Sequence, residues 1–403
     1  MTSDLEHSKR RPPATATFSD LLVTGLGFRP FFLVAGVLAA LIVPVWVANY
    51  LGYLSLVTYY EPVNWHGHEM VFGFTVAVIA GFLLTAVRGW TGYETARGFK
   101  LLGLVAVWLA GRLAPLVPLA LPRSVIAAAD LAFLPCLLAV IVPPLWRDGR
   151  ARNLAVVPVL LALFVANVLV HLEVLGFTTH AARTGTYMAV DVVGLLIVVV
   201  GGRVIPFFTE RAVAGARVRR NVAVEWTAIG SAAALVALAP FARSSTAAMS
   251  FAGVAATANL VRLAFWHDRR VWRLPLLWVL YLGYGWLACG FALRALAIAG
   301  TLPAIVALHA ATAGAIGVLT LGMMARVSLG HTGRPLDPPA MVVAAFVLAN
   351  LAVVARVVLP IVAPASYAGW LATAAVLWTA AFGLFLVTYV PVLVRPRIDG
   401  RAG

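Results

Sequence analysis

Apolar stretches long enough to form membrane-spanning helices recur along the whole 403-residue chain. A helix needs about 20 consecutive apolar residues to span the hydrocarbon core of a bilayer. The stretches are too long, and alternate too little, to be the strands of a membrane barrel. We therefore predict an all-α integral membrane protein with about twelve transmembrane helices. The predicted spans cover residues 31–50, 70–87, 101–120, 125–145, 154–175, 187–208, 222–241, 246–266, 274–298, 302–327, 341–361 and 367–394.

The composition agrees with lipid as the main solvent of this chain. Hydrophobic residues make up 62% of the sequence and charged residues 11%, whereas soluble domains average about 25% charged residues. The net charge is +15, but the basic residues are spread over many short loops and form no motif of a nucleic-acid binder. We expect membrane lipid as a partner and no nucleic acid. Cys136 and Cys289 lie in apolar runs and indicate neither a disulfide nor a thiolate metal site.

The basic residues also predict the orientation. Cytoplasmic loops of membrane proteins carry an excess of Lys and Arg. If both termini are cytoplasmic, 24 of the 30 basic residues fall on the cytoplasmic side; the exceptions are Arg112, Arg123, Arg183, Arg243, Arg294 and Arg356. We therefore predict twelve spans with both termini in the cytoplasm. Residues 1–19 are predicted to form a flexible cytoplasmic tail, and residues 20–403 a single polytopic transmembrane domain.

A weak internal repeat accompanies these spans. The second, sixth and tenth predicted helices end on the inner side with Arg88, Arg203 and Arg326, each followed within a few residues by a threonine. A spacing of four helices indicates three four-helix units. Ordinary arginines at helix ends explain the same pattern equally well.

Four of the eight histidines lie at one level near the outer surface in this topology. His66 and His68 open the second span, His171 lies about one turn inside the fifth, and His309 about two turns inside the tenth. Ionisable residues at membrane depth are costly and usually face a bundle interior. Because neutral imidazole is a natural ligand of haem iron and copper, we predict that these side chains bind haem and copper.

The division of these histidines between the two cofactors stays open. His66 and His68 are two residues apart and do not share one face of a helix, so they either converge at the helix start or serve different metals. We predict haem between one of them and His309, and copper at the other together with His171. Glu69 is expected to orient a neighbouring ligand.

Two of the candidate ligands have equally good structural explanations. His171 has Asn167 and Glu173 nearby, which fits a polar helix end as well as a metal ligand. His331 lies just past the inner end of the tenth span between two glycines, which fits a loop cap as well as a metal site.

Buried charges accompany the outer histidines. Asp130 and Asp191 lie toward the outer side of the predicted helices, as do Arg112, Arg294 and Arg356. The arginines suit haem propionates, because a guanidinium binds a carboxylate through two charge-assisted hydrogen bonds. Structural ion pairs between these arginines and Asp130 or Asp191 are the equal alternative.

Five motifs follow one another along the chain after residue 19. They are Gly27–Phe32 (GFRPFF), Trp65–Met70 (WHGHEM), Gly81–Ala86 (GFLLTA), Gly201–Pro206 (GGRVIP) and Arg326–Gly333 (RVSLGHTG). In this order they resemble the NnrS family of bacterial membrane proteins over nearly the whole chain.

The resemblance implies a haem- and copper-containing protein of the bacterial inner membrane that serves the response to nitric oxide and nitrosative stress. It implies that His66, His68, His171, His309 and His331 match histidines of the family. It names neither a reaction nor an electron donor. Nitric oxide is the expected small-molecule ligand.

The chain departs from the family pattern on the inner side. Tyr281 stands where a histidine is expected, which puts an inner metal site of Tyr281 and His331 in doubt, although tyrosine also ligates haem iron. Arg88 and Gly89 replace an expected Pro-Asn. By analogy alone, subunit I of haem–copper oxidases also has twelve helices in three four-helix arcs and takes haem ligands from helices two and ten.

Three functions are compatible with these features. The first is a haem/copper protein that binds, senses or redox-processes nitric oxide or its products, with metal-dependent redox activity if it is an enzyme. The second is a multi-pass transporter of a metal complex or small metabolite, but the broken helices typical of inverted transporter halves are missing from the pattern. The third is a chaperone that inserts haem or copper into other proteins.

Overall fold

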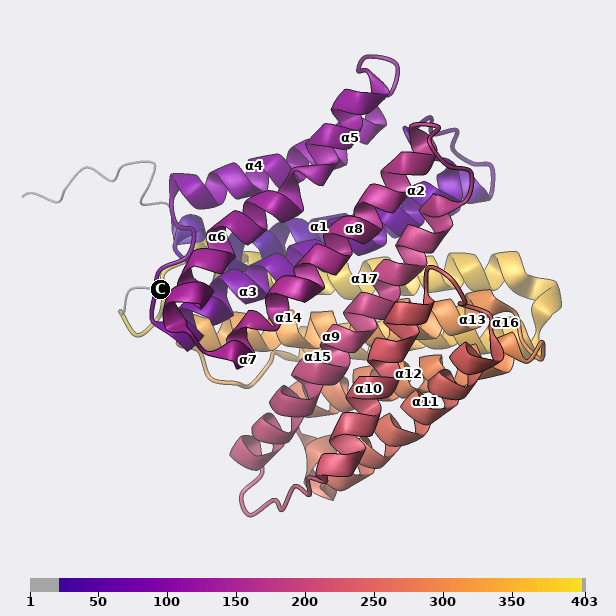
Figure 1. The fold of residues 1–403 in the computed structure, drawn as a ribbon. Coiled ribbons are helices and arrows are strands. Elements are labelled where there is room, and N and C mark those ends of the chain that lie inside the picture. The colour runs from indigo at the N-terminus through magenta and orange to yellow at the C-terminus, as the bar shows by residue number, and fades with distance from the viewer. Residues whose placement is uncertain (1–21, 401–403) are drawn as a thin grey trace, which may run out of the picture.

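The computed structural model describes residues 22–400 as a bundle of long helices that run beside one another (Figure 1). The structure is 80% helical, and no strand occurs within this described range. The all-α fold class is therefore confirmed. The predicted flexible tail at residues 1–19 lies outside the described residues.

Eleven helical segments in the described range are long and apolar enough to cross a membrane. A twelfth helix, α10, is shorter at 17 residues. The spans are α1 (Phe28–Tyr50), α2–η3–α3 (Pro62–Thr91), α4–η4 (Phe99–Leu116), α5–α6 (Arg123–Asp148), α8 (Val156–Val174), α9 (Ala181–Ala212), α10 (Val222–Leu238), α11 (Thr246–Trp266), α12 (Pro275–Ile298), α13–η6–α14 (Ala304–His331), α15–η7–α16 (Ala340–Val362) and η8–α17 (Pro364–Val394).

Local sequence explains several helix ends. The side chains of Asn221 and Ser245 accept hydrogen bonds from the backbone N–H groups three residues on and thereby cap α10 and α11. Pro62 and Pro275 occupy the first turns of α2 and α12, where a missing N–H costs nothing. Gly149 ends α6 with a φ of 66°, a left-handed conformation that favours glycine.

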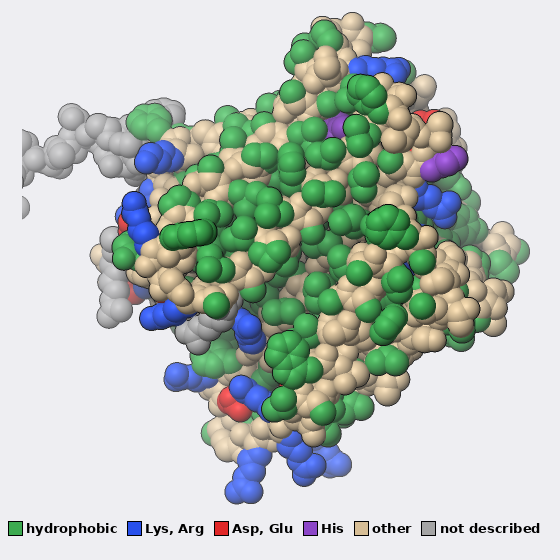
Figure 2. Space-filling view, in the orientation of Figure 1, with side chains coloured by type: hydrophobic (Ala, Val, Ile, Leu, Met, Phe, Trp, Pro, Cys, Tyr) green, Lys and Arg blue, Asp and Glu red, His purple; other side chains and the backbone are tan. Residues whose placement is uncertain are grey.

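The first and last spans meet at the same end of the bundle. Arg29, at the start of α1, donates hydrogen bonds to the carbonyl oxygens of Leu393 (2.7 Å) and Arg395 (2.8 Å) at the end of α17. A chain whose first span begins where its last span ends crosses the bilayer an even number of times. This contact therefore agrees with twelve crossings. Lys and Arg side chains gather along the left and lower margins of the molecule in Figure 2.

Two predicted helix boundaries near the histidines are wrong. The second span begins at Pro62 rather than at residue 70, so His66 and His68 lie within the helix and not at its start. The cause is a polar run that interrupts the apolar pattern without interrupting the helix. Similarly, α14 continues to His331, which is its last residue and not part of the following loop.

Three spans of the described range contain π-helical segments: η3 (Glu69–Thr75), η6 (Ala310–Gly317) and η7 (Val354–Val358). Such segments are rare and frequently mark functional sites. Here η3 follows His68, η6 follows His309, and η7 contains Arg356. The helix distortions therefore coincide with residues that the sequence singled out for haem and copper.

Candidate metal centre and adjoining cavity

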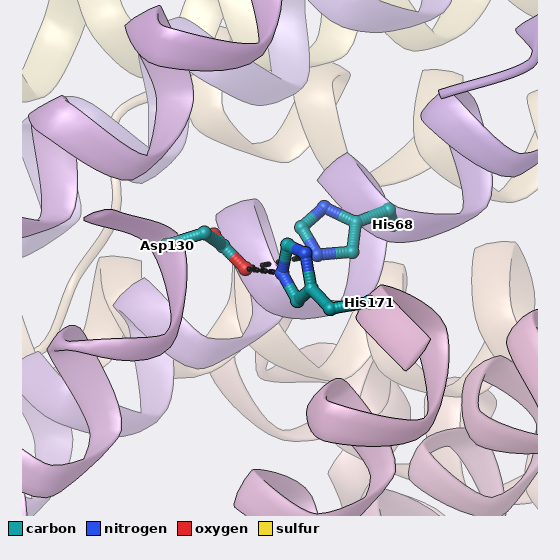
Figure 3. Close-up of side chains that lie close together, drawn as sticks. All are labelled: His68, Asp130 and His171. Carbon is teal, nitrogen blue, oxygen red and sulfur yellow. Dashed lines mark hydrogen bonds and ion pairs between the residues drawn. The ribbon is translucent and has the colours of Figure 1, made fainter. Parts of the chain in front are cut away.

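Three buried side chains from three spans lie close together (Figure 3). They are His68 at the end of α2, Asp130 in α5 and His171 in α8. Each offers one ligand atom, and these atoms all lie within 4.8 Å of one another. Oδ2 of Asp130 is 2.8 Å from Nε2 of His171 and 3.2 Å from Nε2 of His68. We call this group the metal-site cluster.

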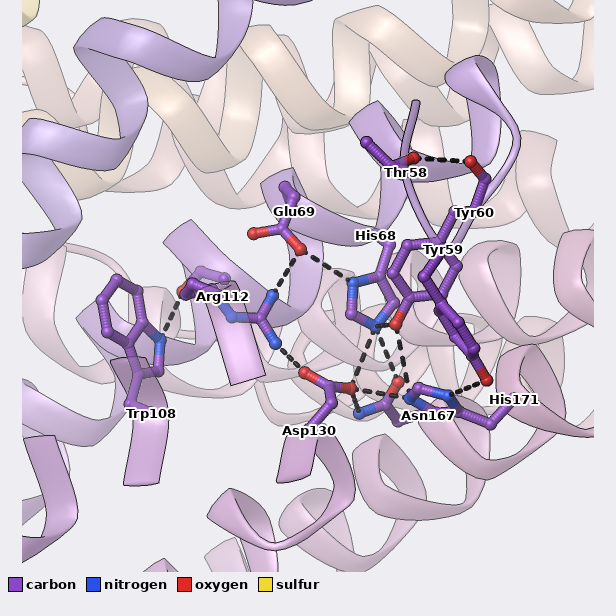
Figure 4. Close-up of polar contacts among 11 residues, drawn as sticks. Thr58, Tyr59, Tyr60, His68, Glu69, Trp108, Arg112, Asp130, Asn167 and His171 are labelled. Carbon is purple, nitrogen blue, oxygen red and sulfur yellow. Dashed lines mark hydrogen bonds and ion pairs between the residues drawn. The ribbon is translucent and has the colours of Figure 1, made fainter. Parts of the chain in front are cut away.

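Neighbouring polar groups hold the cluster in place (Figure 4). Asn167 donates a hydrogen bond to Asp130 Oδ2 (2.8 Å), and its side-chain oxygen lies 3.0 Å from His68 Nε2. The Tyr60 hydroxyl is 3.1 Å from the same nitrogen. Each ligand ring thus has a partner that fixes its orientation, as ligating histidines usually do.

Two tyrosines of the loop before α2 place their hydroxyls within hydrogen-bond distance of the cluster's imidazole rings. The Tyr59 hydroxyl lies 3.2 Å from His171 Nδ1. Burial raises the pKa of Tyr59 to about 12, and burial raises the pKa of Tyr60 well above its ordinary value. Both side chains therefore remain protonated at neutral pH and are available as donors to imidazole nitrogen.

The formal charges around the cluster do not cancel. Arg112 forms ion pairs with Glu69 (2.8 Å) and with Asp130, and all three side chains are buried. One guanidinium faces two carboxylates, which leaves one negative charge uncompensated. A buried charge is costly unless it is paired. With both carboxylates ionised, a metal cation or a bound proton at the cluster balances the remaining charge.

His68 has carboxylate or amide oxygens near both of its ring nitrogens. Its Nδ1 lies 3.2 Å from Glu69 Oε1, while Nε2 faces Asp130 and Asn167 oxygens. A neutral imidazole has a single N–H and cannot donate at both nitrogens. Between Nε2 and the Asp130 carboxylate there is a place for a metal cation, as for a second imidazole proton, while the Tyr60 hydroxyl lies beside the same nitrogen. The donor set of two imidazoles and one carboxylate suits copper, zinc or iron.

The backbone at Gly73 allows Arg112 to reach the cluster. A Cβ atom at Gly73 would lie 3.2 Å from Arg112 Nη1 and 2.6 Å from Leu38 Cδ2, so a larger residue displaces both neighbours. Trp108 donates its indole N–H to the Gly73 carbonyl (3.2 Å) and holds the same segment from α4.

A cavity of about 540 Å³ lies on the other side of α2. Its volume is within the range of small-molecule and cofactor sites. His66, His309 and Arg356 contribute polar groups to its wall. The remaining wall is mainly apolar, and its aromatic side chains are Trp46, Tyr50, Phe74, Tyr187, Tyr367 and Trp378.

The two cavity histidines both have an unused ring nitrogen. His309 Nδ1 donates to the Ile305 carbonyl (2.9 Å), which leaves the lone pair of Nε2 free. The His66 ring stacks on Trp46 with centroids 4.3 Å apart, and its Nδ1 is buried without a hydrogen-bond partner. Imidazole nitrogens without a hydrogen-bond partner in an aromatic cavity would be suitable ligands for haem iron.

The three arginines predicted on the outer side divide between ion pairs and the cavity. Arg112 pairs with Glu69 and Asp130, and Arg294 pairs with Asp191 at 2.6 Å. These contacts correspond to the ion-pair alternative. Arg356 lines the cavity, with its guanidinium carbon 5.6 Å from the centroid of the Tyr367 ring.

The inner candidates Tyr281 and His331 lie in different surroundings. The Tyr281 hydroxyl donates to the Trp266 carbonyl (2.7 Å) and lies 3.0 Å from the Thr209 hydroxyl. The His331 ring lies against Phe28, with centroids 5.7 Å apart. No hydrogen bond or ring contact joins Tyr281 to His331 within residues 22–400.

Sequence reasoning missed several members of the two sites. Tyr59 and Tyr60 lie in a loop, where no periodicity assigns a direction to a side chain. Trp46 belongs to an apolar helix and is indistinguishable by pattern from a lipid-facing residue. Asp130 was expected as an ion-pair partner, and the structure also places its second oxygen between two histidines.

The fold and the site define the class of protein. It is an all-α multi-pass membrane protein with a buried histidine–carboxylate cluster beside an aromatic cavity. The family model described as NnrS protein matches residues 22–397, and the chain belongs to the NnrS family. Membership associates it with the bacterial response to nitric oxide and with metals. No curated protein matches the chain.

Proposed function

We propose that this protein binds haem in the cavity between His66 and His309, and copper at the metal-site cluster of His68, Asp130 and His171. We place it in the bacterial inner membrane with both termini cytoplasmic. Its two cofactor sites then serve to bind or redox-process nitric oxide or its products.

One observation carries the proposal. His66 and His68 of α2 belong to different sites. The cavity contains His309 together with His66, and the metal-site cluster contains His171 together with His68. Two separate pairs of imidazoles on neighbouring sides of one helix suit two cofactors better than one.

The surroundings of the two pairs match different cofactors. The cavity is large, aromatic and has one buried arginine, which suits a planar apolar group with an anionic edge. The metal-site cluster is compact and holds more carboxylates than guanidinium groups, which suits a single metal cation. Haem iron and copper supply a binding site for nitric oxide and one-electron redox chemistry when bound.

The protein's own groups then have defined roles. His309 keeps one ring nitrogen unprotonated, because its other nitrogen donates to Ile305. The Tyr59 and Tyr60 hydroxyls and Asn167 orient the cluster rings. The aromatic side chains of the cavity wall supply an apolar contact surface for a planar group.

Metal analysis and reduced-minus-oxidised spectra of the purified protein test the proposal. We expect haem and copper in similar amounts per chain and a haem absorbance band that changes on reduction. Protein that retains neither metal and has no haem absorbance contradicts the proposal and favours the transporter. Zinc or iron in the cluster in place of copper overturns the copper assignment alone.

A further inference from the structure

A second group of charged side chains lies near the outer ends of α9 and α12. Asp191 on α9 pairs with Arg294 on α12, with Oδ1 and Nη1 2.6 Å apart. Arg243, from the loop between α10 and α11, places its guanidinium carbon 3.1 Å from the centroid of the Tyr187 ring. The two arginines and Asp191 interact electrostatically with one another.

Several charged atoms in this group have no hydrogen-bond partner. Nε and Nη2 of Arg294 and Nε of Arg243 are buried and unpaired. Oδ2 of Asp191 is also unpaired, so that a single Asp191–Arg294 hydrogen bond is made where a carboxylate and a guanidinium normally make two. Buried donors without partners are costly, and charged ones especially so.

The group also has more positive than negative charge. Arg243 and Arg294 face one carboxylate, and no second Asp or Glu forms an ion pair with either arginine in the described range. Burial lowers the pKa of Arg243, and the charge of neighbouring Arg294 lowers it further. Asp191 forms its direct ion pair with Arg294 and acts on Arg243 only from a distance, so one carboxylate serves two guanidinium groups.

We propose that Arg243 and Arg294 form a binding site for a carboxylate or a similarly small oxyanion. An anion with two oxygens accepts hydrogen bonds from the unpaired guanidinium nitrogens and neutralises the excess charge. Asp191 then competes with the anion for Arg294, and the ring of Tyr187 packs against the guanidinium of Arg243. The site goes beyond the proposed function, because it requires neither haem nor copper.

The carboxylate has two possible sources. Tyr187 lines the cavity on one side and contacts Arg243 on the other, so a propionate of a group bound in the cavity lies on one route to this site. A free anion from the outer aqueous phase is the other source.

Thermal unfolding of the purified protein with an empty cavity tests the site, with acetate as the probe and chloride as the replaced salt at constant ionic strength. A ligand that binds only the folded state raises the unfolding midpoint in a saturable way. We expect such a rise with acetate. An unfolding midpoint that does not respond to acetate overturns the proposal.

Variants separate the anion site from a structural ion pair. Arg243→Gln should weaken acetate binding at least about tenfold, a loss of about 1.4 kcal/mol. This variant leaves the Asp191–Arg294 pair intact, so we expect it to fold. Asp191→Asn should instead tighten acetate binding, because the competing carboxylate is gone. Unchanged acetate binding in Arg243→Gln, or weaker binding in Asp191→Asn, contradicts the assignment.

Arg123→Gln is the matched control, since Arg123 is also an outer arginine but is exposed and donates only to the Val174 carbonyl. It should bind acetate like the parent protein. Adding haem identifies the source: loss of the acetate response assigns the site to a propionate, and an unchanged response assigns it to a free anion. The acetate measurement does not depend on haem binding. A protein that binds no haem would therefore contradict the proposed function without contradicting the anion site.

Discussion

His66 and His68 lie two residues apart on α2, yet their rings enter different sites. The His66 ring stacks on Trp46 in the wall of the cavity. The His68 ring lies between Glu69 and Asp130 in the metal-site cluster. Because residues two apart on a helix point in different directions, one short motif reaches two cofactor sites.

Replacing Asp130 by Asn tests whether its carboxylate is a metal ligand. We expect Asp130→Asn to lose most copper, since an amide oxygen is a weaker ligand and the charge at the cluster changes. The variant should also be less stable by about 3 kcal/mol, because Arg112 loses one of its two buried partners. Metal analysis and thermal unfolding measure both effects.

Asp148→Asn is the control, as Asp148 lies at the other end of the same span and pairs with Arg150. It should keep its copper. Full copper in Asp130→Asn would show that Asp130 acts only as the partner of Arg112.

The stability of the protein should fall at high pH because of Tyr59. Burial raises the pKa of this side chain from 10.0 to about 12. A raised pKa stabilises the fold fully below the ordinary value, and that contribution is lost as the pH rises through the folded value. We therefore expect the unfolding midpoint to fall between about pH 10 and 12, and to fall less in Tyr59→Phe. The exposed Tyr53 supplies the control: Tyr53→Phe should follow the parent protein, and an equal fall in both variants would exclude Tyr59 as the cause.

The contact of Arg29 with Leu393 and Arg395 predicts the topology of the C-terminus. The start of the first span and the end of the last span lie on the same side of the bundle. The distribution of basic residues favours the cytoplasm for that side. A reporter that is active only in the periplasm, fused after residue 394, should be inactive. The same reporter inserted in the loop at Thr178 should be active, and the reverse pattern would invert the orientation.

His331 should matter less for haem than His309. Within the described residues, Tyr281, the candidate second ligand on the inner side, does not contact His331. Its hydroxyl is hydrogen-bonded to the Trp266 carbonyl and lies beside the Thr209 hydroxyl. We expect His331→Ala to keep nearly all of its haem, as measured by the pyridine haemochrome of the purified variant. Equal haem loss in His331→Ala and His309→Ala would establish a ligand site at the inner end.

The amount of structure that the sequence predicts varies between elements. The bounds of α11 (Thr246–Trp266) and α17 (Tyr367–Val394) agree with prediction, because polar or proline-containing turns end their apolar runs. The start of α2 was missed, since helices that line a polar site need not be apolar. No periodicity in the sequence indicates the π-helical segments, which alter the directions of the side chains that follow His68 and His309.

The sequence singled out the histidines of both candidate sites but not which of them lie together. The topology placed His66, His68, His171 and His309 at one level, since they lie near the outer ends of their helices. Which helix-two histidine meets which partner depends on helix rotation and packing, which hydrophobic pattern leaves undetermined. The position of the Asp130 carboxylate between the His68 and His171 rings likewise depends on how α5 packs beside α8.

Haem and copper per chain in two single variants test the central claim most directly. His309→Ala should lose haem and keep copper, because His309 lies in the cavity wall and not in the metal-site cluster. His171→Ala should lose copper and keep most haem, for the converse reason. Both variants should still insert into the membrane, since the remaining helix contacts are unchanged. Full haem in His309→Ala, or full copper in His171→Ala, would contradict the account of two separate cofactor sites.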